Sequence, residues 1–408
     1  MSNVPKLRFK EFSGEWEEKT LGEISSKVLY GIGSSAIAYD GVNKYLRITD
    51  IDESSRTFIP NPLTSPGGDI EEKYKLVAGD LVFARTGAST GKSYLYNEKD
   101  GNLIYAGFLI KFHINKANPY FVYINTFKEQ YYKWVQIMSM RSGQPGINAE
   151  EYKLLPLFLP SKQEQEKIAS FLISTDTKIE QLTKKEELLQ QYKKGVMQKI
   201  FNQEIRFKAD DGSEFCEWEE KKLEDLIERT STGLNPRQNF VLGSGLNYYV
   251  TIKNIKNGNL DFSSCEMIDD EALTLIHRRS QIQKNDIIMS SIGNIGESYL
   301  IKENPTNWDI NESVFMLRPN SKVVPKYLYY TITGYKAKQY FENNSTGSSV
   351  TSIKVNTLKI MPVTVACLEE QTKIANFLSE IDFKIEQVKK YMKSIKDLKK
   401  TLLKELII

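Results

Sequence analysis

The sequence predicts an α+β protein in which two mixed α/β domains stand in tandem and each is followed by a long helix. Residues 164–172 recur as residues 370–378, at an offset of 206 and with no gap. Each copy of this motif follows a stretch in which short apolar runs alternate with Gly, Asn, Asp and Ser, as in strands and turns. From each motif onward, apolar residues recur every three or four positions, which is typical of coiled-coil helices. We therefore expect the two helices to form an antiparallel coiled coil with pseudo-twofold symmetry.

Weaker echoes of the repeat set the expected domain boundaries. Trp-Glu-Glu-Lys at 16–19 recurs at 218–221, and Gly-Asp-Leu-Val at 79–82 recurs as Asn-Asp-Ile-Ile at 285–288. A chain of 408 residues also exceeds what one hydrophobic core usually holds. We expect globular domains at 1–160 and 203–368, and helices at 161–202 and 369–408.

Within the domains, runs rich in Ile, Val, Phe and Tyr predict strands, and proline at a first helical turn predicts two amphipathic helices. The helices are expected at 119–135 and 325–341. The clearest strand candidates are 45–48, 80–84 and 108–112 in the first copy, and 248–252, 286–289 and 314–317 in the second.

Each long helix carries one apolar seam. A helix of about 40 residues is roughly 60 Å long, which exceeds one domain, so we expect the helices to pack on each other. The predicted helix-pairing residues are Ile168, Leu172, Ile179, Leu182, Leu189, Val196, Ile374, Leu378, Ile381, Ile385, Val388, Ile395 and Leu402. Apolar residues outside the seam are expected to remain for a partner: Phe171, Leu188, Met197, Phe377, Leu398 and Leu403.

Composition narrows the class of protein. No apolar run approaches the length of a membrane span and the first residues lack a signal-peptide core, so we expect a cytoplasmic chain that does not contact membranes. Three isolated cysteines and two histidines argue against a disulfide framework, a zinc site or a catalytic histidine in each copy. No metal site is predicted, although carboxylates alone remain a possible ligand set.

The charge balance gives no sign of a DNA-binding surface by itself. The formal net charge is +3, and residues 1–160 carry 19 Lys and Arg against 18 Asp and Glu, while 203–368 carry 19 against 21. Neither domain has the bulk positive charge of a typical DNA-binding domain. Any DNA contact must therefore arise from local clustering of side chains in the fold.

Three kinds of segment resemble catalytic motifs, but each lacks a spacing or a residue that the motif requires. Residues 87–93 resemble a P-loop, but three residues instead of four separate the glycines, and Glu297 replaces the lysine in the second copy. Asn118-Pro119-Tyr120 approaches the Asn-Pro-Pro-Tyr/Phe loop of adenine N6-methyltransferases but lacks its middle proline. Carboxylate pairs such as Asp50 with Asp52 have no catalytic Lys or His at a recognisable spacing. No catalytic residue is predicted.

Paired loops remain as candidates for binding. Loops 85–93 and 290–294 each follow a predicted strand, and loops 141–148 and 345–350 each precede the strand that leads into a long helix. Ser, Thr, Asn, Gln and Arg are the usual partners of phosphates and base edges, whereas ordinary turns and structural ion pairs are the alternative. The candidate DNA-binding residues are Arg47, Arg85, Thr86, Ser89, Thr90, Lys92, Arg141, Ser142, Gln144, Lys253, Asn254, Ser290, Ser291, Asn294, Thr346, Ser348 and Ser349. Among them, Arg85 and Arg141 could bond guanine O6 and N7 bidentately or clamp a phosphate.

Taken together, these features resemble the specificity (S) subunit of type I restriction–modification systems. The resemblance rests on the Gln-x-x-Ile-Ala-x-Phe-Leu passages after Pro160 and after Val365, on the Trp-Glu-x-x-x-Leu openings, and on the Asp80 and Asp286 strands. It covers essentially the whole chain. Two departures lie in the second copy, where Asn285 replaces a glycine and Ala366 stands where the first copy has proline.

The resemblance implies a non-catalytic chain with two target-recognition domains, each reading half of a bipartite, asymmetric DNA site. The antiparallel helices would set the spacing and dock two modification (M) subunits, which would methylate adenine N6 with S-adenosylmethionine. Restriction (R) subunits would use ATP and Mg, so this chain itself would need no cofactor. The alternative is a tandem adaptor that binds other proteins, not DNA, through its coiled coil.

Overall fold

The computed structural model describes residues 4–237, 239–347 and 350–407, and the chain forms two compact units. The first unit comprises residues 1–183 together with 390–408, and the second comprises residues 184–389. Each unit therefore contains one globular domain and one half of each long helix. Within the described residues, no helix is long and apolar enough to cross a membrane.

The first unit is built on a four-stranded antiparallel sheet of order β2-β9-β6-β7. Residues of β6 alternate between two cores: Leu81 and Phe83 face one, Val82 and Ala84 the other, as the two-residue period of a strand requires. The sheet strands are β2 Ser25–Tyr30, β6 Asp80–Ala84, β7 Ser93–Leu95 and β9 Leu109–Ile114. Three strand pairs flank them: β1 Glu17–Thr20 with β10 Pro156–Leu159, β3 Ala36–Ala38 with β5 Thr64–Pro66, and β4 Lys44–Leu46 with β8 Leu103–Tyr105. The helices are α1 Pro119–Asn125, α2 Glu129–Met138 and α3 Ala149–Lys153, with 3-10 turns η1 Ile48–Asp50, η2 Glu72–Tyr74 and η3 Glu98–Asp100.

The second unit repeats this plan with the order β12-β20-β17-β18. In β17, Ile287 and Met289 face one core and Ile288 faces another. The sheet strands are β12 Ile227–Thr232, β17 Ile287–Ser290, β18 Ser298–Leu300 and β20 Val314–Pro319. The flanking strands are β11 Glu219–Lys222 with β21 Pro362–Val365, β13 Asn247–Val250 between β16 Glu266–Ile268 and β19 Trp308–Ile310, and β14 Ile255–Lys256 with β15 Asn259–Leu260. The helices are α5 Asp270–Ser280, α6 Pro325–Thr333, α7 Tyr335–Asn344 and α8 Val355–Lys359, with η4 Leu223–Asp225, η5 Ile252–Asn254 and η6 Phe262–Ser264.

Two local predictions were wrong in detail. The helices predicted at 119–135 and 325–341 are each broken in two, because the backbone is extended at Lys128 between α1 and α2 and at Gly334 between α6 and α7. The strands predicted at 45–48 and 248–252 end early. There η1 and η5 begin, and the buried side chains of Asp50 and Asn254 cap the turns.

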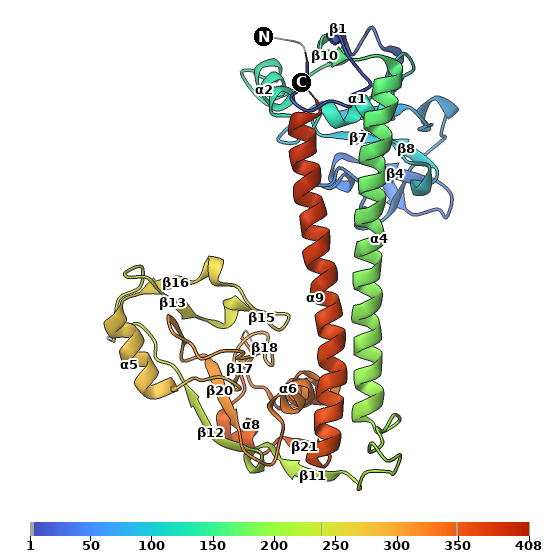
Figure 1. Ribbon diagram of the computed structural model, residues 1–408. Coiled ribbons are helices and arrows are strands. Elements are labelled where there is room, and N and C mark those ends of the chain that lie inside the picture. Colours follow the sequence, from blue (N-terminus) through green and yellow to red (C-terminus); the bar gives the residue numbers. More distant parts are fainter. Residues whose placement is uncertain (1–3, 238, 348–349, 408) are drawn as a thin grey trace. The chain divides into compact units, whose positions relative to one another are not determined.

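The long helices are α4 Lys162–Phe201 and α9 Leu368–Glu405, and their halves run antiparallel within each unit (Figure 1). In the first unit Lys399 bonds Asp176. In the second unit Lys193 Nζ lies 2.5 Å from Asp382 Oδ1, and Lys389 lies 3.5 Å from Glu186. All predicted helix-pairing residues are buried or half-buried.

The expectation about spare apolar residues was half wrong. Phe171, Leu188 and Leu398 are exposed, at 40%, 52% and 54%. The other three, Met197, Phe377 and Leu403, pack against the domain cores instead.

The repeated Glu-Gln motif clamps each domain to its helix. Glu164 accepts two bonds from Arg8 at 2.8 and 2.7 Å, and Glu370 accepts two from Arg206 at 3.0 Å each. Such charge-assisted pairs are among the stronger hydrogen bonds, and both glutamates are almost fully buried.

The neighbouring glutamine of the motif fixes the start of a domain helix. Gln165 accepts from the Asn118 amide at 2.9 Å and donates to the Pro160 carbonyl at 2.8 Å. Gln371 accepts from the Val324 amide at 2.7 Å and donates to the Ala366 carbonyl at 2.8 Å. Because only the carbonyl is used, alanine can replace proline in the second copy.

The other departure from the family pattern, Asn285 in place of glycine, is explained by the local backbone conformation. Gly79 has a φ of 90°, in the left-handed region, and Asn285 occupies the matching position with a φ of 72°. Asparagine tolerates this region better than most side chains, so the turn before the strand survives the substitution.

Candidate nucleic-acid interface

In the first unit, the two candidate loops bond directly to each other. The Gly87 amide donates to the Pro145 carbonyl at 2.9 Å, and the Ile147 amide donates to the Arg85 carbonyl at 2.9 Å. Thr86 and Gly146 form an antiparallel bridge between these bonds. Two segments that are about 55 residues apart in the sequence thus form one surface at the end of β6.

The second unit repeats the arrangement bond for bond. The Gly293 amide donates to the Thr351 carbonyl at 2.8 Å, and the Ile353 amide donates to the Ser291 carbonyl at 2.9 Å. All four positions lie at the repeat offset from their first-unit equivalents. The sequence placed these loops at matched positions, and the fold joins them into what we call the loop pair of each unit: 85–93 with 141–148, and 290–298 with 345–353.

Two of the three candidate arginines are held by carboxylates. Arg47 makes bonds of 2.8 and 2.7 Å to Asp50. Arg141 lies 2.5 Å from Glu151 and donates to two main-chain carbonyls, while Glu151 also caps α3. Both arginines have structural partners, which leaves their guanidinium groups less free for a ligand.

Arg85 is held differently. Its Nε donates to the Gly107 carbonyl at 3.1 Å, and its guanidinium carbon lies 5.3 Å from the ring centre of Tyr30 and 5.9 Å from that of Phe108. Among the described residues it has no carboxylate partner. Phe108 is 59% exposed and Tyr30 39% exposed, so this group lies at the surface.

Four candidates are buried and serve the fold, so they drop out of the interface. Lys92, at 7% exposure, bonds the Ile51 carbonyl at 3.1 Å and Glu53 at 2.5 Å. This lysine therefore ties the P-loop-like segment to a neighbouring loop. The other three, Asn254, Ser290 and Ser291, are at most 5% exposed, and their side chains bond nearby main-chain groups.

The remaining candidates stay accessible. Ser142, Gln144, Lys253, Asn294 and Thr346 are exposed. Thr86, Ser89 and Thr90 are half-buried, and the Thr90 hydroxyl donates to the Gly87 carbonyl at 2.7 Å. Ser348 and Ser349 lie outside the described residues.

Sequence reasoning missed the basic end of α5 in the second unit. Arg278 and Arg279 are exposed there, and Arg279 donates to the Thr232 hydroxyl at 3.2 Å. Arg229 joins them by donating to the Arg279 carbonyl at 3.0 Å. Asp269 at the N-cap and the Arg278-Arg279 pair in the last turn could have predicted a helix with a basic C-terminal end.

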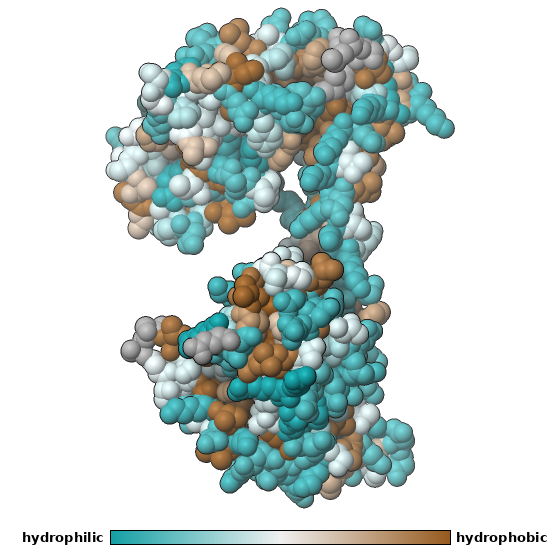
Figure 2. Space-filling view, turned by 90° about the vertical axis from the view of Figure 1, so that its left-hand side faces the viewer, coloured by the Kyte–Doolittle hydropathy of each residue, from teal (hydrophilic) through white to brown (hydrophobic). Residues whose placement is uncertain are grey.

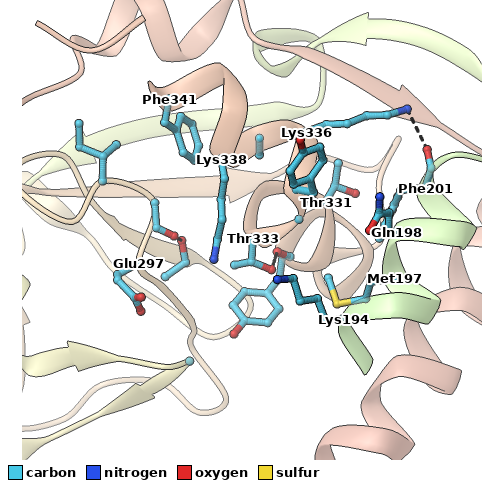
Figure 3. A pocket seen from close by; sticks show the side chains of 18 of the residues that line it. Lys194, Met197, Gln198, Phe201, Glu297, Thr331, Thr333, Lys336, Lys338 and Phe341 are labelled. Atoms are coloured by element: carbon cyan, nitrogen blue, oxygen red, sulfur yellow. Dashed lines mark hydrogen bonds between the residues drawn. The ribbon is translucent and has the colours of Figure 1, made fainter. Parts of the chain in front are cut away.

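An open cleft of about 990 Å³ lies beside the loop pair of the second unit (Figure 3). Its walls come from α4, the α6–α7 corner and the loop 293–298. The side chains of Lys194 and Lys338 point into it, whereas Lys336 turns away to donate to the Phe201 carbonyl at 3.0 Å. The cleft thus contains two exposed lysines, and the candidate residue Asn294 also lines it.

Burial shifts the pKa values of two ionisable groups, one in each unit. Burial lowers the pKa of Lys128, at the N-terminus of α2, to about 8. Burial also raises the pKa of Asp309, which accepts hydrogen bonds from Ser280 and the Ile310 amide beneath α5. Within the described residues, no cluster of three His, Cys, Asp or Glu side chains could hold a metal ion.

Comparison with known proteins identifies the family. Residues 13–190 and 216–397 each match the Type I restriction modification DNA specificity domain. A putative type I restriction enzyme MjaX specificity subunit of Methanocaldococcus jannaschii is 24% identical over 99% of this chain and 96% of that protein. The MjaVIII specificity subunit of the same organism is 23% identical over 65% of this chain and 64% of its own length.

Solved structures agree on the fold. The type I restriction–modification S subunit from M. genitalium superposes with a TM-score of 0.61 at 16% identity, over 99% of both chains. A chain from a study of type I R-M complex assembly gives 0.52 at 14% identity, over 96% of this chain and 97% of that one. The predicted fold class is confirmed, and the chain belongs to the family of type I restriction–modification specificity subunits, with two DNA-specificity domains in tandem.

Proposed function

We propose that each unit reads one half of a bipartite, asymmetric DNA site within a type I restriction–modification complex. The observation that carries this proposal is the loop pair, which has the same main-chain bonds in both units and different exposed side chains. The shared main-chain scaffold supports one DNA-reading surface on each unit, at the same position in both. Different side chains on it favour two different half-sites, since base edges are read by side-chain chemistry.

The near-neutral charge fits a reader that works in a complex. Affinity for the phosphate backbone depends on positive charge, and this chain carries a net charge of only +3. We propose that M subunits supply much of that affinity. Exposed basic groups such as Lys194, Lys338 and Arg278 add local contacts in the second unit.

The exposed apolar residues of the long helices support docking of M subunits. In the second unit Leu188, Tyr192 and Phe383 are 52%, 55% and 61% exposed, and in the first unit Tyr391 and Leu398 are 51% and 54% exposed. The face shown in Figure 2 is mostly hydrophilic, with scattered apolar patches on both units. Apolar side chains on a helix pair are suited to a helical partner. We propose one M subunit for each unit and a site spacing set by the helices.

The chemistry is assigned to the partners. M subunits would carry S-adenosylmethionine and methylate adenine N6, and R subunits would use ATP and Mg. The P-loop-like lysine of this chain is used for an internal ion pair, which removes one argument for activity of its own. Methyl transfer by the purified chain without M subunits would contradict this assignment.

The direct test is to express the chain with its M subunit and to map every methylated adenine in the host genome. A two-part sequence interrupted by a fixed spacer is the expected result. The purified complex should then prefer a duplex carrying that sequence over a scrambled one. A complex that assembles and binds no duplex would favour the adaptor function instead.

A further inference from the structure

The exposed cluster formed by Arg85, Tyr30 and Phe108 has a geometry that suits one kind of DNA group. The Arg85 amide donates to the Phe108 carbonyl at 3.0 Å, and Arg85 Nε donates to the Gly107 carbonyl at 3.1 Å. The Tyr30 hydroxyl accepts from the Ala149 amide at 3.0 Å. The Arg85 main chain and the Tyr30 ring are therefore held in place before any ligand binds.

These bonds leave a defined part of the guanidinium free. With Nε occupied, the two terminal nitrogens, Nη1 and Nη2, remain as a planar pair of donors, and they have no hydrogen-bond partner within the described residues. A planar pair of N–H donors matches two acceptors on one edge. Guanine presents such a pair, O6 and N7, in the major groove.

The surroundings favour a base over a phosphate. Phe108 is 59% exposed beside the guanidinium, and an apolar ring suits base edges and thymine methyl groups better than a hydrated phosphate. A guanidinium held near two rings also loses little side-chain freedom on binding. Arg47 and Arg141 lack this setting because carboxylates hold them.

Among its described residues, the second unit has no equivalent cluster. By strand register and main-chain bonds, Thr232, Ser291 and Ser313 replace Tyr30, Arg85 and Phe108. Ser291 is 5% exposed, and its hydroxyl donates to the Ser313 carbonyl at 2.7 Å. The cluster is therefore a feature of the first reader alone.

We infer that Arg85 reads a guanine in the half-site of the first unit, with Tyr30 and Phe108 as positioning residues. This inference rests on the proposed function and adds the base, the residue and the unit. It predicts a single guanine whose N7 and O6 are required, and no such dependence on Ser291 in the other half-site.

The test uses the complex with M subunits and duplexes carrying the mapped site, with 7-deazaguanine replacing one guanine at a time in both half-sites. Loss of N7 at one position removes one of the two acceptors, so it should weaken binding of the unaltered complex by less than loss of the whole bidentate contact. Arg85→Ala removes both bonds and should weaken binding of the normal duplex by about 5- to 150-fold, the range for losing a bidentate base contact. It should show no further loss on the modified duplex.

Arg85→Lys separates the two possible roles. Lysine keeps the charge but not the planar pair of donors, so the loss of affinity at that guanine should persist. Phe108→Ala should give a smaller loss of affinity at the same guanine, and Phe108→Tyr should restore it. Lys73→Ala, a charge change at another exposed site of the first unit, should leave the guanine dependence intact. Restoration of full affinity by lysine, with no sensitive guanine, would overturn the inference.

The outcomes also separate this inference from the function beneath it. An assembled complex that binds all duplexes alike would contradict both. A mapped bipartite site in which no guanine depends on Arg85 would overturn this inference and leave the proposed function standing. The modified duplexes test the unaltered protein, so a variant that fails to fold does not remove the test.

Discussion

The two units share a framework and differ at its surface. In both, a buried glutamate and glutamine tie the domain to its helix, and a loop pair closes with matching main-chain bonds. On that framework, the first unit presents Arg85 beside two aromatic rings, and the second presents small residues there and a basic helix end at α5. Main-chain contacts persist while exposed side chains change, which is what two readers of different sequences require.

One position, buried in the first unit and half-buried in the second, shows how far side chains can differ without loss of the scaffold. Lys92 reaches Glu53 in the first unit, and the matching residue of the second unit is Glu297, with the opposite charge. Glu297 accepts instead from the Asn257 amide at 3.0 Å. Either chemistry ties the loop after the central strand to the same neighbouring segment.

The largest expected effect on stability concerns the buried glutamates that tie each domain to its helix, Glu370 and Glu164. Glu370→Ala should destabilise the chain by about 3–5 kcal/mol, since it leaves Arg206 without its buried carboxylate partner. Glu164→Ala should cost about 1 kcal/mol less, because Glu370 also accepts from Trp218 Nε1 at 2.8 Å, while Trp16 Nε1 has no partner among the described residues. Urea unfolding of the two variants measures the difference. Equal losses would mean that the two clamps are equivalent.

Lys128 makes the stability of the first unit depend on pH. Burial lowers the pKa of Lys128 from 10.5 to about 8, so the folded first unit disfavours the charged form. The matching position of the second unit, at the repeat offset, is Gly334, which carries no charge. Lys128→Met should raise stability below about pH 8 by at most roughly 3 kcal/mol. The gain should fade as pH rises from about 8 to 10.5, because the wild-type lysine then loses its proton too.

Thermal unfolding of wild type and variant across this pH range measures the effect. The control is Lys133→Met, which removes an exposed lysine that pairs with Glu129 on the same helix. It should change stability little at any pH. A gain for Lys128→Met that does not vary with pH would point to packing, with no contribution from the charge.

A smaller effect is expected at the helices. Leu188→Glu in the second unit and Leu398→Glu in the first should each weaken binding of one M subunit by about 1–3 kcal/mol. Native mass spectrometry of the complex should show one M subunit in place of two at concentrations near the dissociation constant. Lys400→Glu, an exposed change on a different face of α9, is the control. Unchanged stoichiometry for both leucine variants would contradict docking at these residues.

The periodic features of the fold were predictable, and the site was predictable only in part. The seams of α4 and α9 follow from apolar spacing, and the matched positions of the loops follow from the repeat, whereas the main-chain bonds that join two loops into a pair could not be predicted. The burial of Lys92, Ser290 and Ser291 depends on segments far along the chain, which one sequence does not reveal. Tyr30 and Phe108 were missed for the same reason, since only strand pairing brings them to Arg85.

The central claim, that each unit reads its own half-site, has one direct test. Adenine methylation is mapped for complexes in which exposed loop residues are changed in one unit at a time: Ser142→Ala with Gln144→Ala, or Asn294→Ala with Thr346→Ala. Each pair should relax one half-site and leave the other unchanged, and the two pairs should affect opposite halves. If both pairs relax the same half-site, or either relaxes both, the two units do not read separately.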